Sequence, residues 1–386
     1  MTTYCTAIWT HHQAEVCKEL HKILGDEFRM VLTLPLDAPV SKERIAMGWE
    51  LIPPDEDWIV GPPKTVAEAR SVDYSKYIID SDVAVLGWIP EVPDSLVMRR
   101  IRSGKLTFFQ SERLFKQKPT LKDWLNPFYL KWRFSLWRKL HLKNVHFLTL
   151  SYWCAEDLES LGVCRGRTWK WGYLTAVSDR PTEKPTQTKV RIGWCGRFLC
   201  WKNVCDILKA CSLLEDSVKS EIEVVIVGDG PEKDSLVRMS HDLGLDNIVT
   251  FKPFLPQKEA LAFMESIEIF PFPSGRLEGW GAILPEAMDK CCAVVASEDA
   301  GSTLMLVRDG ENGFTYRAGD VAMLSKRIAE LVKDSDLRRR FGLAAWHTMQ
   351  RWTPRVGAKA LVGLISALRS GNESMLPING LCSRVR

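Results

Sequence analysis

Short apolar runs alternate with amphipathic segments of helical period along most of the chain. In its first half, buried strands are predicted at 4–9, 29–34, 83–88, 106–109 and 146–150, with amphipathic segments between several of them. Strands that alternate with helices are typical of parallel βαβ units. The pattern therefore predicts an α/β fold.

A polar stretch rich in Pro and Thr, SDRPTEKPTQTK, interrupts this alternation, which then restarts. Such a stretch is typical of an interdomain linker. We therefore predict two Rossmann-like domains with parallel sheets. The predicted boundaries are an N-terminal domain at 1–175, a linker at 176–189, a C-terminal domain at 190–350, a helix at 351–370 that packs back on the N-terminal domain, and a mobile tail at 371–386.

Composition agrees with a globular protein of two domains. The chain has 386 residues, of which 46% are hydrophobic and 26% charged, and its net charge of +4 gives no sign of a nucleic-acid partner. No apolar run is long enough to span a membrane, the N-terminus lacks a signal-peptide pattern, and the 11 cysteines show no C-x-x-C spacing. We therefore expect a cytoplasmic protein with reduced, mostly structural thiols.

Ligands of open parallel sheets bind beyond the carboxyl ends of the strands, so binding residues are expected on those loops. The first predicted strand of the second domain leads into GRFLCWK at 196–202, which places Arg197 and Lys202 on one loop before a helix. A guanidinium, an ammonium and free backbone N–H groups suit a diphosphate, although two surface cations on a loop would look the same. Gly228 and Gly230, in VGDGPE after the next strand, allow close backbone approach but are a weaker signal.

The stretch LEGWGAILPEAM at 277–288 follows a later predicted strand. Glu278 lies in the loop and Glu286 in the first turns of the next helix, so both carboxylates can face one crevice. Carboxylates accept hydrogen bonds from vicinal hydroxyls, as on sugars and ribose. The alternative is that glutamate is simply favoured near a helix N-terminus. Three further donor-binding candidates bring the backbone close to a bulky ligand: Gly279, Trp280 and Gly281.

Five motifs in the second half of the chain resemble a known family. They are GRF-x3-K at 196–202, VGDGPE at 227–232, E-x7-E at 278–286, VVAS at 294–297 and DGENGF at 309–314. In this order they are similar to the family 4 glycosyltransferases, retaining enzymes of the GT-B fold. The resemblance implies two Rossmann-like domains whose parallel sheets face each other across a cleft, with the acceptor on the N-terminal domain and the nucleotide sugar on the C-terminal domain.

The resemblance also implies a role for each matching residue. Arg197 and Lys202 would neutralise the diphosphate of the donor and assist catalysis. Glu278 would contact the transferred sugar near the reacting carbon, Glu286 would bind the ribose, and the loop at 253–255 would lie against the base. Catalysis would need no metal and no cofactor, because the two cations do the work of a metal ion.

Two segments depart from the family pattern. DKCC at 289–292 replaces a small turn that contains glycine, and AGS at 300–302 replaces a Gly-Gly. The family's contacts to the diphosphate or the sugar are therefore not carried over to the AGS loop.

The first strand of the N-terminal domain is followed by THHQ, where many members of the family have a glycine-rich turn. His11 and His12 are acceptor-side candidates, since imidazoles can hydrogen-bond a hydroxylated or phosphorylated substrate. The alternative is a helix cap with an exposed imidazole. Together with the segments around 112 and 169–173, this turn resembles a bacterial branch of the family that acts in capsule and exopolysaccharide assembly.

Glu112 and Arg113 are the other acceptor-side candidates, on the loop that follows the strand predicted near 105–110. Glu112 lies where an acid facing the cleft is expected. The alternative is a structural ion pair between Glu112 and either Arg113 or Lys116.

A basic and aromatic segment extends from 113 to 143, with nine Lys or Arg against one Asp. On a helix from about 128 to 140, aromatic and aliphatic side chains gather on one side, with Lys131, Arg138 and Lys139 elsewhere, while Arg133 blurs the split. Such helices lie on anionic membrane surfaces, which a lipid-linked acceptor would explain. The alternative is that the aromatics form the core face of a domain helix. RNA is not expected, because no RNA-binding motif accompanies the segment.

These motifs predict a retaining glycosyltransferase of hexosyltransferase type. It would move a sugar from a nucleotide-diphosphate-sugar to a glycan or lipid-linked acceptor, in bacterial surface polysaccharide biosynthesis. We expect it in the cytoplasm, peripheral on the inner face of the plasma membrane. Two alternatives stay open: a sugar-nucleotide epimerase of the same fold, which needs no acceptor, and a non-catalytic sugar-nucleotide-binding protein.

Overall fold

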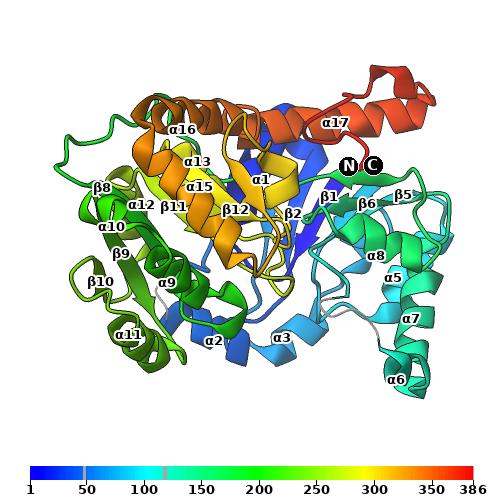
Figure 1. Cartoon of the computed structure of the whole chain (residues 1–386). Coiled ribbons are helices and arrows are strands. Elements are labelled where there is room, and N and C mark those ends of the chain that lie inside the picture. The colour runs from blue at the N-terminus through cyan, green and yellow to red at the C-terminus, as the bar shows by residue number, and fades with distance from the viewer. Residues whose placement is uncertain (47–48, 116–119, 386) are drawn as a thin grey trace. The chain divides into compact units, whose positions relative to one another are not determined.

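The structure, a computed structural model, describes residues 1–46, 49–115 and 120–385. The chain divides into two compact units, one made of Met1–Ala176 with Trp352–Arg386 and the other of Val177–Arg351 (Figure 1). Each unit is built on one parallel sheet with helices in the connections between strands. The α/β class with two parallel sheets is therefore confirmed.

The first unit holds a seven-stranded sheet in the order β3-β2-β1-β4-β5-β6-β7. Its strands are β1 Thr2–Thr6, β2 Phe28–Leu32, β3 Ile59–Val60, β4 Val83–Leu86, β5 Leu106–Ser111, β6 Val145–Thr149 and β7 Thr168–Lys170. β4 and β6 are buried along their whole length, as expected for strands covered on both faces. The short edge strands β3 and β7 lie outside the apolar runs, so the sequence pattern does not reveal them.

The helices of this unit fill the crossovers between its strands. They are α1 His11–Leu24, α2 Pro39–Ala46, α3 Val66–Ser71, α4 Ser75–Ile78, α5 Asp94–Arg102, α6 Leu121–Trp124, α7 Pro127–Leu140, α8 Cys154–Ser160 and, from the end of the chain, α17 Pro354–Ser370. α17 begins at the Thr353 cap, whose Oγ1 accepts from the Val356 N–H at 3.2 Å, and packs against α1. A Cβ atom at Gly357 would lie 2.1 Å from the Leu174 side chain, so glycine at this position lets α17 pack closely against Leu174.

The second unit holds a six-stranded sheet in the order β10-β9-β8-β11-β12-β13. Its strands are β8 Val190–Arg197, β9 Ile222–Asp229, β10 Val249–Lys252, β11 Ile269–Phe272, β12 Ala293–Ser297 and β13 Phe314–Tyr316. Its helices are α9 Val204–Ser212, α10 Asp216–Ser220, α11 Lys233–Asp242, α12 Gln257–Glu265, α13 Ile283–Asp289, α14 Thr303–Leu306, α15 Val321–Lys333 and α16 Ser335–Met349. β8 pairs with β9 up to Arg197 and Asp229, so these two strands end level.

The segment expected as a linker is attached to the second unit. Ser178 donates to the Asp289 carboxylate through both its N–H and its Oγ, each at 2.8 Å. The Lys184 ammonium donates to the carbonyls of Met264 and Lys290, at 3.1 Å and 2.5 Å. The polar side chains that suggest a free linker therefore form hydrogen bonds with polar groups near helix ends.

The last residues differ from the expected mobile tail. The Cys382 N–H donates to the Lys170 carbonyl and the Lys170 N–H to the Ser383 carbonyl, both at 2.8 Å. Leu381, Cys382 and Ser383 are buried. β7 is the edge strand of the sheet, and the end of the chain pairs with its outer side and covers that edge.

Candidate functional site

The strand order of the second unit reverses between β8 and β11. These strands lie side by side, with β9 and β10 beyond one and β12 and β13 beyond the other. In open parallel sheets, the loops at such a switch point form the ligand crevice. The loop after β8 carries Arg197 and Lys202, and the loop after β11 carries Glu278. The charged candidates therefore lie on the two loops that flank the switch point.

Lys202 and Glu278 form an ion pair between these loops, with 2.5 Å from Nζ to Oε2. Both side chains are largely buried, with exposures of 18% and 12%. Beside the pair, the Gly275 N–H donates to the Trp201 carbonyl at 2.8 Å, which fixes one loop to the other. Arg197 is exposed at the end of β8, so its guanidinium is open to an incoming anion. The sequence does not reveal the ion pair, because the partners lie far apart in the chain.

Gly228 and Gly230 bring the loop after β9 against the loop after β8. A Cβ atom at Gly228 would lie 2.0 Å from the Gly196 carbonyl oxygen, and one at Gly230 would lie 2.6 Å from the Phe198 carbonyl oxygen. The Phe198 N–H donates to the Asp229 carbonyl at 2.8 Å in the same place. The close approach expected of these glycines is therefore made to a neighbouring loop.

Gly281 allows the sharp turn between the loop and helix α13. Its φ is 82°, in the left-handed region, and a Cβ atom there would lie 2.5 Å from the Phe272 ring and 3.2 Å from Glu278 Cγ. Gly279 and Trp280 are buried, and the Trp280 carbonyl accepts from the Ser302 N–H at 3.0 Å. The Trp280 ring therefore packs inside the unit and positions this loop.

Glu286 lies half-buried in the first turn of α13. The pKa of Glu286 is raised to about 7, because burial outweighs a hydrogen bond with the Gln257 side chain that lowers it, and the Asp289 charge adds to the rise. Hydroxyl groups of a ligand would take the place of water at this carboxylate and favour its charged form. The helix dipole explains the position of Glu286 as well as ligand binding does.

In the first unit, His12, Tyr173 and Glu112 meet at the carboxyl edge of the sheet, after β1, β7 and β5. The His12 and Tyr173 rings are stacked, with centroids 4.7 Å apart and planes at 18°. The Tyr173 hydroxyl donates to Glu112 Oε1 at 2.8 Å. The pKa of His12 is lowered to about 3, mainly by burial and also by the charges of His11 and Arg44, so this imidazole is neutral at physiological pH.

Two more rings adjoin this group. The His11 ring lies 3.9 Å from His12, and Trp49 lies 5.8 Å from His11, measured between centroids. The Arg44 guanidinium lies over the Trp49 ring at 4.6 Å. Burial lowers the pKa of His11 as well. The N-cap residue of α1 is Thr10, so the histidines do not cap the helix, and both are half-buried.

Arg113 contacts helix α8. Its guanidinium lies 3.9 Å from Asp157 and 3.7 Å from Glu156, and its side chain is 1% exposed. Two carboxylates of α8 therefore contact this buried side chain, and the acceptor-side role of Arg113 stays a prediction. The alternative pairing of Glu112 with Lys116 falls outside the described residues.

Helices α6 and α7 carry the basic aromatic segment at the periphery of the first unit (Figure 1). Arg133 is the buried member, 9% exposed, and lies over the rings of Trp124 and Phe115 at 4.5 Å and 4.9 Å. Many apolar side chains point outward instead: Leu121, Trp124, Leu125, Phe128, Leu130, Trp132, Phe134 and Trp137 are exposed. The alternative of an aromatic core face is therefore wrong for α7, whose buried residues are Arg133 and Leu140.

Comparison with known proteins identifies the second unit. Residues 178–347 match the family model for glycosyl transferases group 1. This part of the chain is therefore similar to the group 1 glycosyltransferases. The domain is similar to the lipopolysaccharide core biosynthesis glycosyltransferase LpsE of Rhizobium meliloti, at 26% identity over 178 residues, which is 46% of this chain and 49% of LpsE. The chain spans about half the length of the curated relatives it matches.

Solved structures extend the likeness to the first unit. The Anabaena HepE protein, crystallised with UDP, has a TM-score of 0.65 at 16% identity, covering 95% of this chain and 99% of HepE. The lipopolysaccharide outer core galactosyltransferase WaaB, in its apo form, has a TM-score of 0.68 at 13% identity, with 95% and 99% covered. At these identities the likeness shows the fold. The chain has the GT-B fold, as its motifs predict.

The DKCC turn of the second unit adopts a backbone that glycine would favour. Cys291 has a φ of 56°, and the left-handed region costs a residue with a side chain about 1–2 kcal/mol. The preceding Asp289 accepts the two hydrogen bonds from Ser178. Asp289, the first residue of the DKCC turn, therefore anchors the segment around Ser178 to the second unit.

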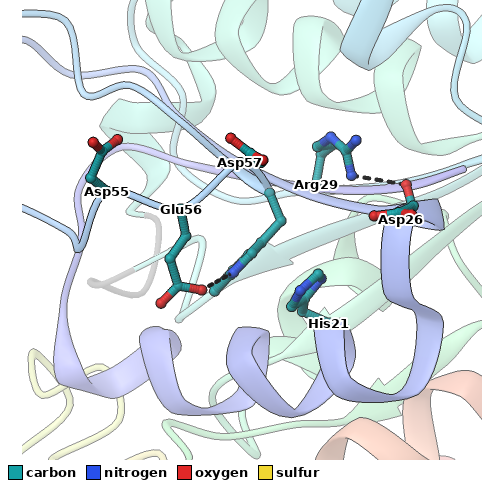
Figure 2. Close-up of a pocket in the computed structure, with 7 residues that line it drawn as sticks. His21, Asp26, Arg29, Asp55, Glu56 and Asp57 are labelled. Carbon is teal, nitrogen blue, oxygen red and sulfur yellow. Dashed lines mark hydrogen bonds between the residues drawn. The ribbon is translucent and has the colours of Figure 1, made fainter.

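A pocket of about 350 Å³ lies at the opposite, amino edge of the first sheet, where α1 ends and β2 and β3 begin (Figure 2). It is lined by His21, Asp26, Arg29, Asp55, Glu56, Asp57 and Trp58. The Asp26 carbonyl accepts from Arg29 at 2.8 Å, and Trp58 donates to Glu56. Its carboxylates are exposed, and it lies away from the strand ends where parallel sheets bind ligands.

Neither a metal site nor a membrane span is found among the residues that the structure describes. No group of three or more His, Cys, Asp or Glu side chains there could hold a metal ion. No helix in the described ranges is long and apolar enough to cross a bilayer.

Sequence reasoning missed Tyr173, Trp49 and Arg44 as members of the group around His12. Tyr173 belongs to the WKWGY motif, but only the fold shows that its ring stacks on a histidine of the first helix. Trp49 and Arg44 follow β2 in a segment without apolar alternation, so no sequence signal links them to the histidines.

Proposed function

We propose that the chain is a retaining glycosyltransferase. It transfers a sugar from a nucleotide-diphosphate-sugar to a glycan or lipid-linked acceptor in bacterial surface polysaccharide biosynthesis. The observation that carries the proposal is the placement of Arg197, Lys202 and Glu278 on the two loops at the switch point of the unit that is similar to the group 1 glycosyltransferases. The LpsE relative acts in lipopolysaccharide core biosynthesis, and HepE binds UDP, which supports this class of pathway and donor.

Each charged residue has a role in this proposal. Arg197 and Lys202 bind the diphosphate, since opposite charge is worth most in a site with little water. Glu278 accepts hydrogen bonds from the transferred sugar, and Glu286 accepts them from the ribose hydroxyls. We propose that the reaction needs no metal ion or cofactor, because the two cations stabilise the charge that develops on the leaving group.

The proposed chemistry is a displacement on one face of the sugar. The bond between the anomeric carbon and the diphosphate oxygen breaks, and the acceptor oxygen forms its bond from the same side, so configuration is retained. The acceptor proton passes to the leaving diphosphate, which carries away the electron pair of the broken bond. Lys202 and Arg197 stabilise that leaving group.

Turnover of nucleotide sugars by the full chain tests this function. Lys202→Ala and Glu278→Ala should each lower transfer to bacterial membrane acceptors by about 100-fold or more, since each removes a charge at the reacting groups. Arg340→Ala and Glu311→Ala are matched controls, because both residues are exposed. NMR of the new linkage reads its anomeric configuration.

Three results would count against the proposal. Full activity in either site variant removes the role of that residue, and an inverted linkage removes retention. Interconversion of the donor without an acceptor indicates the epimerase, and binding without turnover indicates the non-catalytic protein.

We also propose that the enzyme works at the inner face of the plasma membrane, on a lipid-linked acceptor. The support is the outward-facing aromatic side chains of α6 and α7, beside the exposed cations Lys122, Lys131 and Arg138. Aromatic and basic side chains on one surface bind the headgroup region of anionic bilayers.

A further inference from the structure

We propose that the ring cluster of the first unit binds a neutral sugar ring of the acceptor. The ring cluster is defined as His11, His12, Trp49 and Tyr173 together with the Glu112 carboxylate. The proposal rests on the proposed function and names the group that the acceptor side recognises. The sequence alone leaves a hydroxylated and a phosphorylated acceptor equally open.

The contacts within the ring cluster suit a pyranose. Half-buried imidazole, indole and phenol rings provide flat apolar surfaces, and the C–H groups of a sugar ring can pack on such surfaces. Glu112 is half-exposed, and a carboxylate has room to accept from sugar hydroxyls besides its bond from Tyr173. Among the described residues, His12 Nδ1 is buried without a hydrogen-bond partner, and such an atom gains most from a ligand hydroxyl.

The Arg44 guanidinium lies over the Trp49 ring at 4.6 Å, but the charges of the ring cluster itself disfavour a phosphate. Both imidazoles have lowered pKa values, so they are neutral at physiological pH and attract no anion. Glu112 would repel a phosphate. Arg113, the cation next to it in sequence, is held by Asp157 and Glu156 on the side of α8.

The position of the ring cluster also fits ligand binding. Its members follow β1, β2, β5 and β7, at the carboxyl edge of the sheet, where ligands of parallel sheets bind. A stacking contact joins His12, at the start of α1, to Tyr173, and a hydrogen bond joins Tyr173 to Glu112. The surface is therefore fixed before the ligand arrives, and less entropy is lost on binding.

Ligand-detected NMR on the full chain with UDP present tests this inference. The probes are methyl glycosides of glucose, galactose, mannose and N-acetylglucosamine, each compared with glucose 1-phosphate. At least one neutral glycoside should receive saturation on its ring protons, and glucose 1-phosphate should bind more weakly. Tyr173→Ala and His12→Ala should weaken glycoside binding about five- to tenfold, since each removes a stacking ring.

Three further proteins complete the test. Tyr173→Phe keeps the ring and removes the hydroxyl that donates to Glu112, so its effect should be smaller than that of Tyr173→Ala. This variant also controls for misfolding. Asp55→Asn, in the pocket of Figure 2, is a control that should bind as the wild type does. Glu112→Gln should weaken binding without affecting the response to UDP.

The inference is overturned if only glucose 1-phosphate binds, if no glycoside binds, or if glycosides bind equally to wild type and ring variants. The thermal shift caused by UDP separates the two proposals, because UDP is expected on the other unit. A normal UDP shift without glycoside binding removes the ring cluster alone. Loss of the UDP shift in the wild type counts against the proposed function.

Discussion

Glutamates near a helix start have two explanations, the helix dipole and a ligand, and the structure treats Glu278 and Glu286 differently. Glu278 lies in the loop before α13 and is held by Lys202, so the dipole does not explain it. Glu286 keeps both explanations. The sequence could predict which residues carry charge at the switch point, because motif spacing places them on loops after strands. It could not predict that two of them pair, since pairing depends on how the loops fold together.

The raised pKa of Glu286 predicts how stability changes with pH. A carboxyl group whose folded pKa exceeds its unfolded value favours the folded state while protonated, so this contribution is complete below about 4.5 and is lost as pH rises through about 7. Relative to Glu286→Gln, the wild type should therefore lose roughly 2–3 kcal/mol between pH 4 and pH 8. Denaturant unfolding of both proteins at a series of pH values measures this difference. An unchanged difference would show that Glu286 titrates normally.

At the scale of elements, prediction succeeds for the central strands and fails at the edges. β4, β6, β8 and β9 contain the apolar runs that burial on both faces requires, so the pattern finds them. β3, β7 and β13 are short and gain their pairing from neighbours, which the sequence does not show. In α7 the amphipathic pattern is present, but many of its apolar side chains are exposed and Arg133 is buried. The Arg133 guanidinium donates to the Ser160 carbonyl and lies over the Trp124 ring inside the unit.

The exposed face of α7 predicts binding to anionic bilayers. Lys131→Glu with Arg138→Glu should lower flotation with phosphatidylglycerol vesicles about tenfold or more, since each cation near the surface contributes about 1 kcal/mol. Phe128→Ser with Phe134→Ser should also lower flotation, and should do so at high salt as well. Lys326→Glu with Arg340→Glu makes the same charge change on exposed residues of the second unit and should leave flotation unchanged. Equal flotation of all four proteins would remove the membrane proposal.

At the scale of the whole molecule, the two ends of the chain serve the same unit. α17 packs on α1, and the last residues cover β7. The sequence pattern reveals α17, because its helical period is clear. It gives no sign of the tail contact, because a few residues that pair with an edge strand carry no periodicity.

Deletion of residues 381–386 should expose the edge of β7 and destabilise the first unit by roughly 2–4 kcal/mol, through lost burial of Leu381 and lost backbone bonds. Hydrogen exchange of the β7 amides, followed by mass spectrometry, should become faster. Ile378→Ser is the control, since this side chain is 79% exposed and contributes little. Unchanged exchange after the deletion would show that the tail contact is not stable in solution.

The ion pair between Lys202 and Glu278 has a consequence for the order of events in a catalytic cycle. Under the proposed function, a diphosphate that draws Lys202 away leaves a largely buried carboxylate without its counter-ion, which is unfavourable unless sugar hydroxyls replace it. An intact nucleotide sugar supplies a diphosphate for Lys202 and sugar hydroxyls for Glu278. A nucleoside diphosphate supplies only the partner of Lys202. Under this proposal the free protein would discriminate between substrate and spent donor, and re-formation of the pair would help to expel the product after transfer.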